Sequence, residues 1–124
     1  MLKVMDVMTP KVVCVSPSTP VIEVAYKMKV AGVTLTPVCS RSKFRGVITA
    51  GDIVTRLVAN GIDPVTTSAV SIMNSNYPLI SPDAYITEAA KIMVKNSIRI
   101  LPVVQSSRLL GLVSLYDVTL KGML

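Results

Sequence analysis

One seven-residue stretch decides the fold, and it reads Gly46-Val47-Ile48-Thr49-Ala50-Gly51-Asp52. It returns 65 residues later, from position 46 to position 111, as Gly111-Leu112-Val113-Ser114-Leu115-Tyr116-Asp117. The same shift aligns the chain with itself without a gap, and it places Met73 on Met8. One register held over this length indicates a tandem repeat. Since each copy is too short to bury a good core alone, we expect the two copies to pack face to face about an approximate two-fold axis.

Both copies have the same expected order of elements, which is strand, helix, strand, strand, helix. A short β-branched run opens each copy and ends at Ser-Pro. Apolar residues then recur at helical spacing, as in Val21, Val24 and Met28. Two strands joined by a short polar loop predict a hairpin, and a second helix follows it. The expected strands lie at 12–15, 35–40 and 44–50 in the first copy and at 77–80, 100–105 and 109–115 in the second. The expected helices run from Pro20 to Gly32 and from 52 to 61 in the first copy, and from 86 onward and from 117 onward in the second. Residues 62–68 form the expected linker between the copies.

This order resembles the cystathionine-β-synthase-type (CBS) domain. The resemblance is carried by a Pro-Val pair on one strand, at Pro37-Val38 and Pro102-Val103, and by the Gly-to-Asp stretch that follows. The openings Val7-Met8-Thr9-Pro10 and Ile72-Met73-Asn74-Ser75 also match the usual start of the family. The resemblance implies an α+β fold of two βαββα units, at 1–62 and 63–124, packed with pseudo-two-fold symmetry as a Bateman module. It further implies that AMP, ADP, ATP or S-adenosylmethionine binds in clefts between the units, and that the chain forms a homodimer through helices.

The motifs Thr49-x-x-Asp52 and Ser114-x-x-Asp117 carry the chemistry of this expectation. Each lies where a strand turns into a helix, and the free N–H groups of a helix start suit a phosphate. The hydroxyl can bond a phosphate or a sugar, and the carboxylate can accept hydrogen bonds from both neighbouring hydroxyls of a ribose. The same spacing is also that of a capping box, in which these side chains bond their own helix. We interpret both motifs as nucleotide-binding, and a capping role does not exclude this.

Arg99 is the candidate for the phosphate tail, because a guanidinium forms paired hydrogen bonds with phosphate. Thr34 stands at the equivalent position of the first copy, so this charge is not repeated. The two sites are therefore expected to be unequal, with the site of Ser114 and Asp117 favoured for the charged phosphates. The alternative for Arg99 is a side chain in solvent. By the resemblance, the remaining nucleotide-binding residues line the clefts or hold the adenine, and they are Thr36, Pro37, Leu101, Pro102, Val12, Val13, Tyr77 and Pro78.

The chain carries a net charge of +6, and this charge is uneven. Residues 1–62 hold eight Lys and Arg against three acids, whereas residues 63–124 hold five against four. A basic half suits a phosphate-bearing partner. Arg41, Lys43 and Arg45 alternate along the first hairpin and point the same way if the strand is regular. They form either a solvated edge or a patch for phosphate or nucleic acid.

Catalysis is not expected, because the chain has no histidine and no GxxxxGK[ST] phosphate loop. No cofactor or metal is expected either. Cys14 and Cys39 are interpreted as small buried hydrophobes, and a disulfide between them depends on their geometry. The sequence has no run of eighteen apolar residues and no signal peptide, which favours a cytoplasmic protein without a membrane span. The leading hypothesis is a regulatory protein that senses an adenine nucleotide; the alternatives are a basic nucleic-acid-binding protein and a structural dimerisation module with empty clefts.

Overall fold

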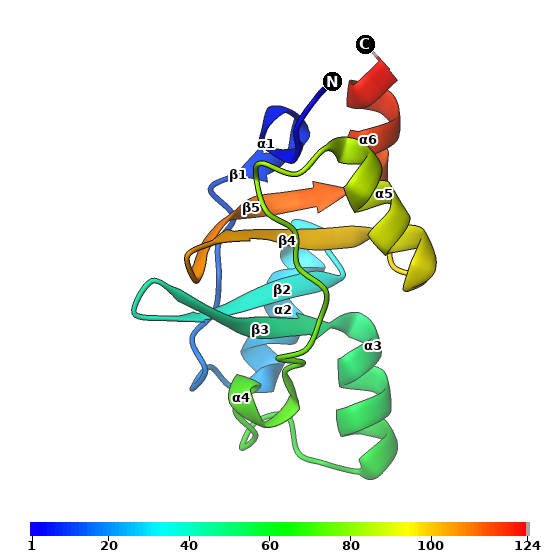
Figure 1. Cartoon of the computed structure of the whole chain (residues 1–124). Helices are drawn as coiled ribbons and strands as arrows, with labels where there is room; N and C mark the ends of the chain where they lie inside the picture. The colour runs from blue at the N-terminus through cyan, green and yellow to red at the C-terminus, as the bar shows by residue number, and fades with distance from the viewer. Residues whose placement is uncertain (124) are drawn as a thin grey trace. The chain divides into compact units, whose positions relative to one another are not determined.

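The computed structural model describes residues 1–123, which form two compact units (Figure 1). The middle unit consists of Val13–Tyr77, and the N/C unit combines Met1–Val12 with the chain from Pro78 onward. This division differs from the expected one at residue 62. Its physical reason is an exchange of opening segments: the opening of the first repeat copy pairs with strands of the second copy, and the opening of the second copy bonds the strands of the first.

The middle unit is built on one antiparallel hairpin covered by helices. The expected strand at 12–15 is reduced to one parallel bridge between Val15 and Val38. The second expected helix forms, but along its length it changes from an α-helix to a π-helix and then to a 3-10 turn. The elements are α2 (Val21–Ala31), β2 (Leu35–Ser40), β3 (Lys43–Thr49), α3 (Ala50–Asp52), a π-helical segment η1 (Ile53–Leu57), a 3-10 turn η2 (Val58–Asn60) and α4 (Ala69–Ile72).

The N/C unit repeats this plan with one strand added. Its sheet has the order β1-β5-β4, and both pairings are antiparallel. The expected strand at 77–80 is again one parallel bridge, between Ile80 and Val103. The elements are α1 (Val4–Val7), β1 (Thr9–Pro10), α5 (Ile86–Lys95), β4 (Ile100–Gln105), β5 (Arg108–Ser114), α6 (Leu115–Leu120) and a 3-10 turn η3 (Lys121–Met123).

The two hairpins share their turn and their irregularity. Each turn has two residues, Arg41-Ser42 and Ser106-Ser107, and all four have positive φ between 51° and 67°. Two-residue turns with positive φ at both positions have a backbone twist that fits the right-handed twist of paired strands. A bulge follows at the same place in each hairpin, between Val38 and Cys39 and at the equivalent step of β4. Arg45 is the extra residue of the first bulge, so the regular alternation expected for Lys43 and Arg45 is interrupted there.

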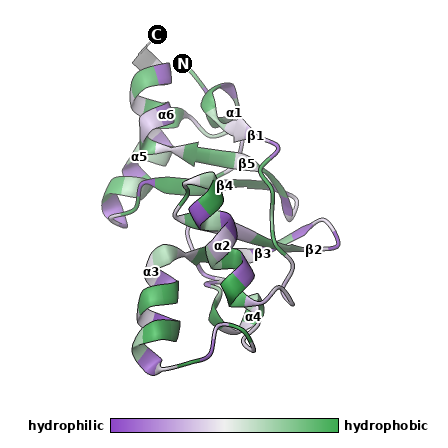
Figure 2. Cartoon of the chain, turned by 180° about the vertical axis from the view of Figure 1, so that it is seen from behind, coloured by the Kyte–Doolittle hydropathy of each residue, from purple (hydrophilic) through white to green (hydrophobic). Residues whose placement is uncertain are grey.

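Each unit has its own apolar core, and each core includes residues of one short opening helix. Figure 2 shows apolar residues recurring along the helices and strands of both units. Val4 and Val7 of α1 lie in the core of the N/C unit, and Ala69 and Ile72 of α4 occupy the equivalent places in the middle unit. The expected helix faces are confirmed, since Val21, Val24 and Met28 are all buried. Gly32 ends α2 with φ +68°, a left-handed conformation that glycine adopts without strain. Within residues 1–123 no helix has the length and apolarity to cross a membrane.

Candidate functional site

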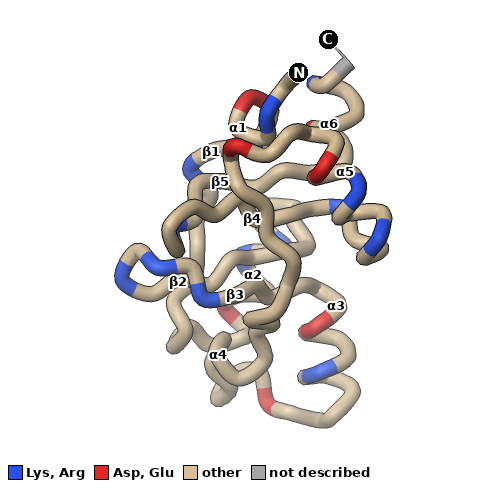
Figure 3. Tube along the Cα trace, in the orientation of Figure 1, with Lys and Arg blue, Asp and Glu red and all other residues tan. Residues whose placement is uncertain are grey.

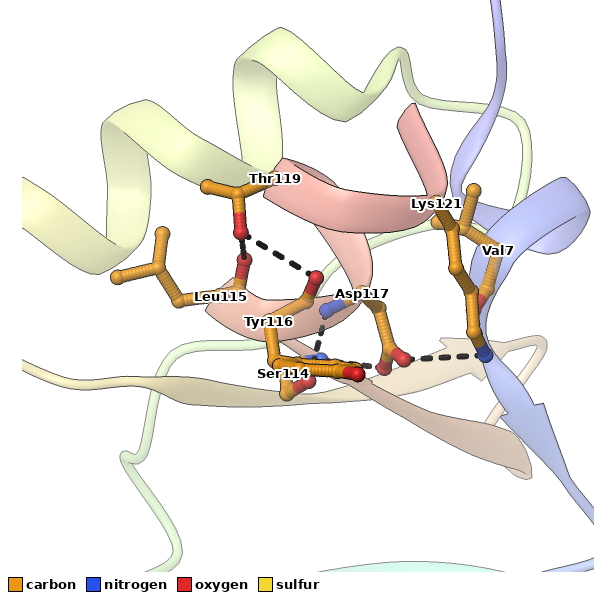
Figure 4. A network of polar contacts seen from close by, with 7 residues as sticks. All are labelled: Val7, Ser114, Leu115, Tyr116, Asp117, Thr119 and Lys121. Atoms are coloured by element: carbon orange, nitrogen blue, oxygen red, sulfur yellow. Dashed lines mark hydrogen bonds and ion pairs between the residues drawn. The ribbon is translucent and has the colours of Figure 1, made fainter. Parts of the chain in front are cut away.

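Both predicted motifs form capping boxes at the start of a helix, and Figure 4 shows the one at α6. At α6, the Ser114 N–H donates to Asp117 Oδ2 at 2.9 Å, and the Asp117 N–H donates to Ser114 Oγ at 3.0 Å. At α3, the Thr49 N–H donates to Asp52 Oδ2 at 2.9 Å, and the Asp52 N–H donates to Thr49 Oγ1 at 3.1 Å. The capping interpretation is therefore confirmed in both copies, and a ribose-binding role remains a prediction.

The Asp117 carboxylate is almost fully engaged by the protein itself. The residue is 6% exposed, and its Oδ1 forms an ion pair with Lys121 Nζ at 3.1 Å. The same ammonium donates to the Val7 carbonyl at 3.1 Å, which ties the C-terminal helix to the opening helix α1 (Figure 4). Both oxygens of Asp117 thus have partners within the N/C unit. The primary effect of this carboxylate is to fix the start of α6, where the candidate site lies.

A hollow of about 410 Å³ lies beside the start of α6. It is lined by Arg99, Ser114, Leu115, Tyr116 and Thr119, all of which belong to the N/C unit. Its volume falls within the usual range for small-molecule pockets. The Leu115 N–H donates to the Arg99 carbonyl at 2.8 Å, so the start of β4 and the start of α6 are held together. The structure therefore brings the predicted Arg99 and Ser114 into one site.

The Arg99 guanidinium is the free positive charge of this hollow. The side chain is exposed, and the one ion pair within residues 1–123 joins two other residues, Lys121 and Asp117. Three other residues that line the hollow, Ser114, Tyr116 and Thr119, each carry a hydroxyl group. A guanidinium near hydroxyl groups can bind a phosphate through several charge-assisted hydrogen bonds.

Tyr116 and Thr119 are functional candidates that the sequence interpretation missed. Tyr116 is 65% exposed at the edge of the hollow, where its ring can stack on a base or sugar. The Thr119 hydroxyl donates to the Leu115 carbonyl at 2.9 Å and retains acceptor capacity. The repeat contained a signal for both residues, because the first copy has Gly51 and Val54 at the equivalent positions.

The middle unit has an equivalent but less charged arrangement. The Ala50 N–H donates to the Thr34 carbonyl at 2.9 Å, as the Leu115 N–H does to Arg99. Thr34 thus takes the place of Arg99, and the expected inequality of charge holds in the structure. Tyr77 lies near Asp52: burial raises the pKa of the phenol, and the negative charge of Asp52 raises this pKa further. Of the predicted residues in this unit, Thr34, Thr49, Asp52 and Tyr77 therefore gather around the start of α3.

The predicted residues of the Pro-Val strands have buried side chains. Leu101 is fully buried in the core of the N/C unit, Thr36 is 8% exposed, and Pro37 and Pro102 are buried. The Leu101 side chain has no exposed surface, and a role for Leu101 in lining a cleft stays a prediction. The two prolines act through their carbonyls instead. The Pro37 carbonyl accepts from the Val15 N–H at 3.0 Å, and the Pro102 carbonyl accepts from the Ile80 N–H at 3.1 Å.

The remaining predicted residues lie where the two units exchange their segments. Val12 and Pro78 belong to the N/C unit, whereas Val13 and Tyr77 belong to the middle unit. Val13 is 77% exposed, while Val12 and Pro78 are half-buried. A role for these residues in holding adenine stays a prediction.

The basic residues of the first hairpin lie at its turn and along β3 (Figure 3), and all three are exposed. Arg41 lies in the turn, and Lys43 and Arg45 lie on β3 on either side of Phe44. These three residues have no acidic partner within the described chain. They are a solvated edge or a surface for an anionic partner, as the sequence predicts.

The fold and the paired motifs define a tandem α+β repeat protein. The CBS domain family matches the chain twice, over residues 4–59 and 69–121, and the chain belongs to this family. It is 32% identical to the CBS domain-containing protein YhcV of Bacillus subtilis over 123 residues, which cover 99% of this chain and 87% of the relative.

Two solved structures confirm the fold. The crystal structure of Hypoxic Response Protein I, which contains two coordinated zinc ions, has a TM-score of 0.89 and 27% identity, covering 98% of this chain and 99% of that protein. The structure of CBSX2 in complex with AMP has a TM-score of 0.85 and 22% identity, covering 99% and 97%. Within residues 1–123 of the present chain, no three His, Cys, Asp or Glu side chains are grouped as a metal site.

Proposed function

We propose that this CBS-domain pair binds an adenine nucleotide and regulates a partner without catalysing a reaction. The observation that carries the proposal is the hollow beside α6, whose lining combines Arg99, which forms no ion pair within residues 1–123, with three residues that carry hydroxyl groups. A site with one cation, several hydroxyls and an aromatic ring fits a phosphorylated nucleoside. The AMP complex of CBSX2 supports the proposal, because it places such a ligand in a protein of this fold.

Each group in the hollow has a proposed task. Arg99 binds the phosphates in a paired manner, and the hydroxyls of Ser114 and Thr119 bond phosphate or sugar oxygens. Tyr116 stacks on the base or the ribose. Asp117 acts as a positioning residue, because its two oxygens hold Ser114 and Lys121. In the middle unit, one carboxylate oxygen of Asp52 has no bond to Thr49. This oxygen is proposed to accept hydrogen bonds from the hydroxyl groups of a ribose.

Nucleotide-dependent thermal unfolding tests the proposal with a matched pair of variants. AMP, ADP, ATP or S-adenosylmethionine at a hundred times its dissociation constant is expected to stabilise the wild type by roughly 2.7 kcal/mol. Arg99→Ala removes a hydrogen bond to a charged group and is expected to weaken binding roughly 10- to 100-fold. Arg108→Ala changes the net charge equally, but Arg108 opens β5 at the hairpin, so its nucleotide response stays that of the wild type.

The outcomes separate the three hypotheses. Equal loss of binding in Arg99→Ala and Arg108→Ala would show that only net charge matters. A shift with an oligonucleotide but with none of the four nucleotides would favour the nucleic-acid-binding alternative. No shift with either kind of ligand would favour a dimerisation module with empty clefts.

We further propose that the chain forms a homodimer through the outer face of α2. Ile22, Tyr26 and Val30 recur every four residues along this helix and are 48%, 64% and 69% exposed. The equivalent positions of α5 carry Thr87, Lys91 and Lys95, which are polar. The fold itself therefore does not require an apolar stripe at these positions, and a contiguous exposed stripe indicates an interaction surface.

The charges beside the stripe favour a second copy as the occupant. Glu23 and Lys27 lie on the same flank of the stripe, about one helical turn apart. In an antiparallel pairing about a two-fold axis at Tyr26, Ile22 faces Val30 of the other copy. The same symmetry brings Glu23 of each copy near Lys27 of the other. The surface is thus complementary to itself, as an isologous dimer requires.

Tyr26→Lys tests this interface by copying the residue that α5 already tolerates, Lys91. Loss of a central aromatic anchor is expected to weaken self-association by about 100-fold or more, measured by sedimentation equilibrium. Tyr116→Lys makes the same change at a side chain of equal exposure, 65%, and is expected to leave the association unchanged. A monomeric wild type, or a Tyr26→Lys protein that still dimerises, would contradict the proposal.

A further inference from the structure

The two cysteines of the chain lie side by side within the middle unit. Both are free thiols with intermediate burial. Cys14 is adjacent to Val15, and Cys39 is adjacent to Val38, the two residues that form the parallel bridge. The Cys39 N–H donates to the Val15 carbonyl at 2.9 Å, and the Val15 N–H donates to the Pro37 carbonyl at 3.0 Å. This pair of bonds fixes the opening segment against β2 on both sides of the bridge.

Both cysteine side chains lie on the side of this bridge away from the core. Val15 and Val38 point into the apolar core of the unit, so Cys14, one residue before the bridge, and Cys39, one residue after it, point to the opposite side. The two thiols are close enough for Cys14 to affect the ionisation of Cys39. Burial raises the pKa of the Cys39 thiol to about 12, and the hydrogen bond with the Cys14 thiol and its charge contribute to this increase.

The fold does not need sulfur at these two positions. The repeat shift of 65 residues places Leu79 on Cys14 and Val104 on Cys39, and both are ordinary apolar residues. The N/C unit forms the same parallel bridge and the same bulge with them. The thiol pair is therefore a feature of this copy alone, added to a backbone arrangement that stands without it.

We propose that Cys14 and Cys39 form an intramolecular disulfide when the protein meets a peroxide, and that this modification site is separate from the nucleotide-binding function. In the first step the Cys14 thiolate attacks one oxygen of hydrogen peroxide, which gives a Cys14 sulfenic acid and hydroxide. In the second step the Cys39 sulfur attacks the Cys14 sulfur. The S–S bond forms as the S–O bond breaks, and the hydroxyl leaves as water with the Cys39 proton. Two thiols are oxidised, and one peroxide is reduced to two waters.

The raised pKa of Cys39 supports this order of steps. The thiolate is the attacking species, so the thiol that stays protonated at neutral pH acts second. Cys39 is therefore assigned as the resolving thiol, and the disulfide is expected to form slowly because this thiol is seldom ionised.

The disulfide would tie the opening segment to β2 and close a loop of 26 residues, from 14 to 39, that contains all of α2. Closing a loop of this size restricts the unfolded chain. The oxidised protein is expected to melt roughly 10 °C higher than the reduced protein. The crosslink also lies next to Pro37 and Val13, so it stiffens the segment on which an adenine is predicted to rest.

Peptide mapping of the full chain after treatment with hydrogen peroxide tests the proposal. Trypsin releases Cys14 in the peptide 12–27 and Cys39 in the peptide 30–41. The expected product is these two peptides joined, lighter by two hydrogen atoms than their sum, with monomeric protein on a non-reducing gel. The variants Cys14→Leu and Cys39→Val copy the residues of the second repeat and should fold. Neither should form the joined peptides or show the rise in melting temperature.

Other products would overturn the proposal. These are a disulfide between two chains, a sulfinic acid on Cys14 with Cys39 still reduced, or unmodified thiols after the peroxide is consumed. A joined product that leaves the melting temperature unchanged would contradict the structural effect of the crosslink. The nucleotide response is measured separately on the reduced protein, so failure of either proposal is distinguishable from failure of the other.

Discussion

Replacing Gly111 by alanine is expected to lower the free energy of unfolding by about 2 kcal/mol. Gly111 lies on β5 opposite Pro10 of β1, and a Cβ at this position would overlap the Thr9 carbonyl oxygen. It would also lie 3.2 Å from Pro10 Cα and from Met8 Sδ. Two of these three neighbours are backbone atoms of a paired strand, so they cannot move without breaking the β1–β5 pairing. Urea unfolding followed by circular dichroism measures the loss.

Gly46→Ala and Gly51→Ala serve as the parallel and the control for this prediction. At Gly46 the added Cβ would lie 2.8 Å from the Asn74 carbonyl oxygen, so a loss of similar sign is expected in the middle unit. At Gly51 the nearest atom is Thr49 Oγ1 at 3.6 Å, an ordinary contact, and the residue lies in helix α3. Alanine favours a helix over glycine by about 1 kcal/mol, so no loss is expected there. Equal stability of all three variants would show that the opening segments do not approach these glycines closely.

These glycines also show how far the sequence predicts the fold. Their repetition is visible at once in the sequence, and so are the hairpins and the two long helices. The reason for the repetition is not visible, because it lies in the exchange of opening segments between the copies. Helices α1 and α4 have only four residues each, too few for a helical period to appear. The pairing of β1 with β5 is a contact between residues far apart in sequence.

The candidate site was also predictable only in part. Residue chemistry identified Arg99, Ser114 and Asp117, and the repeat showed that Arg99 has no charged equivalent. The sequence could not decide which side chains of a strand face a ligand. In β4, Leu101, Pro102 and Val103 are buried in succession, so the strand has no alternation from which a ligand-facing side could be inferred. Tyr116 was missed because it occupies an unspecified position of the Ser-x-x-Asp motif, although its difference from Gly51 in the first copy distinguishes it.

Leu101→Ala is expected to be among the most destabilising single changes in the N/C unit, with a loss of about 3 kcal/mol. Leu101 is fully buried, lies opposite Val113 of β5 and belongs to the same core as Met93 and Val4. Truncation removes buried apolar surface and leaves a cavity that paired strands cannot fill. Leu79→Ala makes the same chemical change at a side chain that is 42% exposed, and its loss is expected to be less than half as large.

The nucleotide response decides between a core role and a binding role for Leu101. If the side chain acts only in the core, Leu101→Ala lowers the melting temperature, but saturating nucleotide raises it by the same increment as in the wild type. Binding at a temperature well below the transition, measured by calorimetry, should then show an unchanged dissociation constant. A variant that keeps its stability but loses its nucleotide response would place Leu101 against the ligand. In that case β4 would have to present this side chain to the site, and the core packing described above would be incorrect.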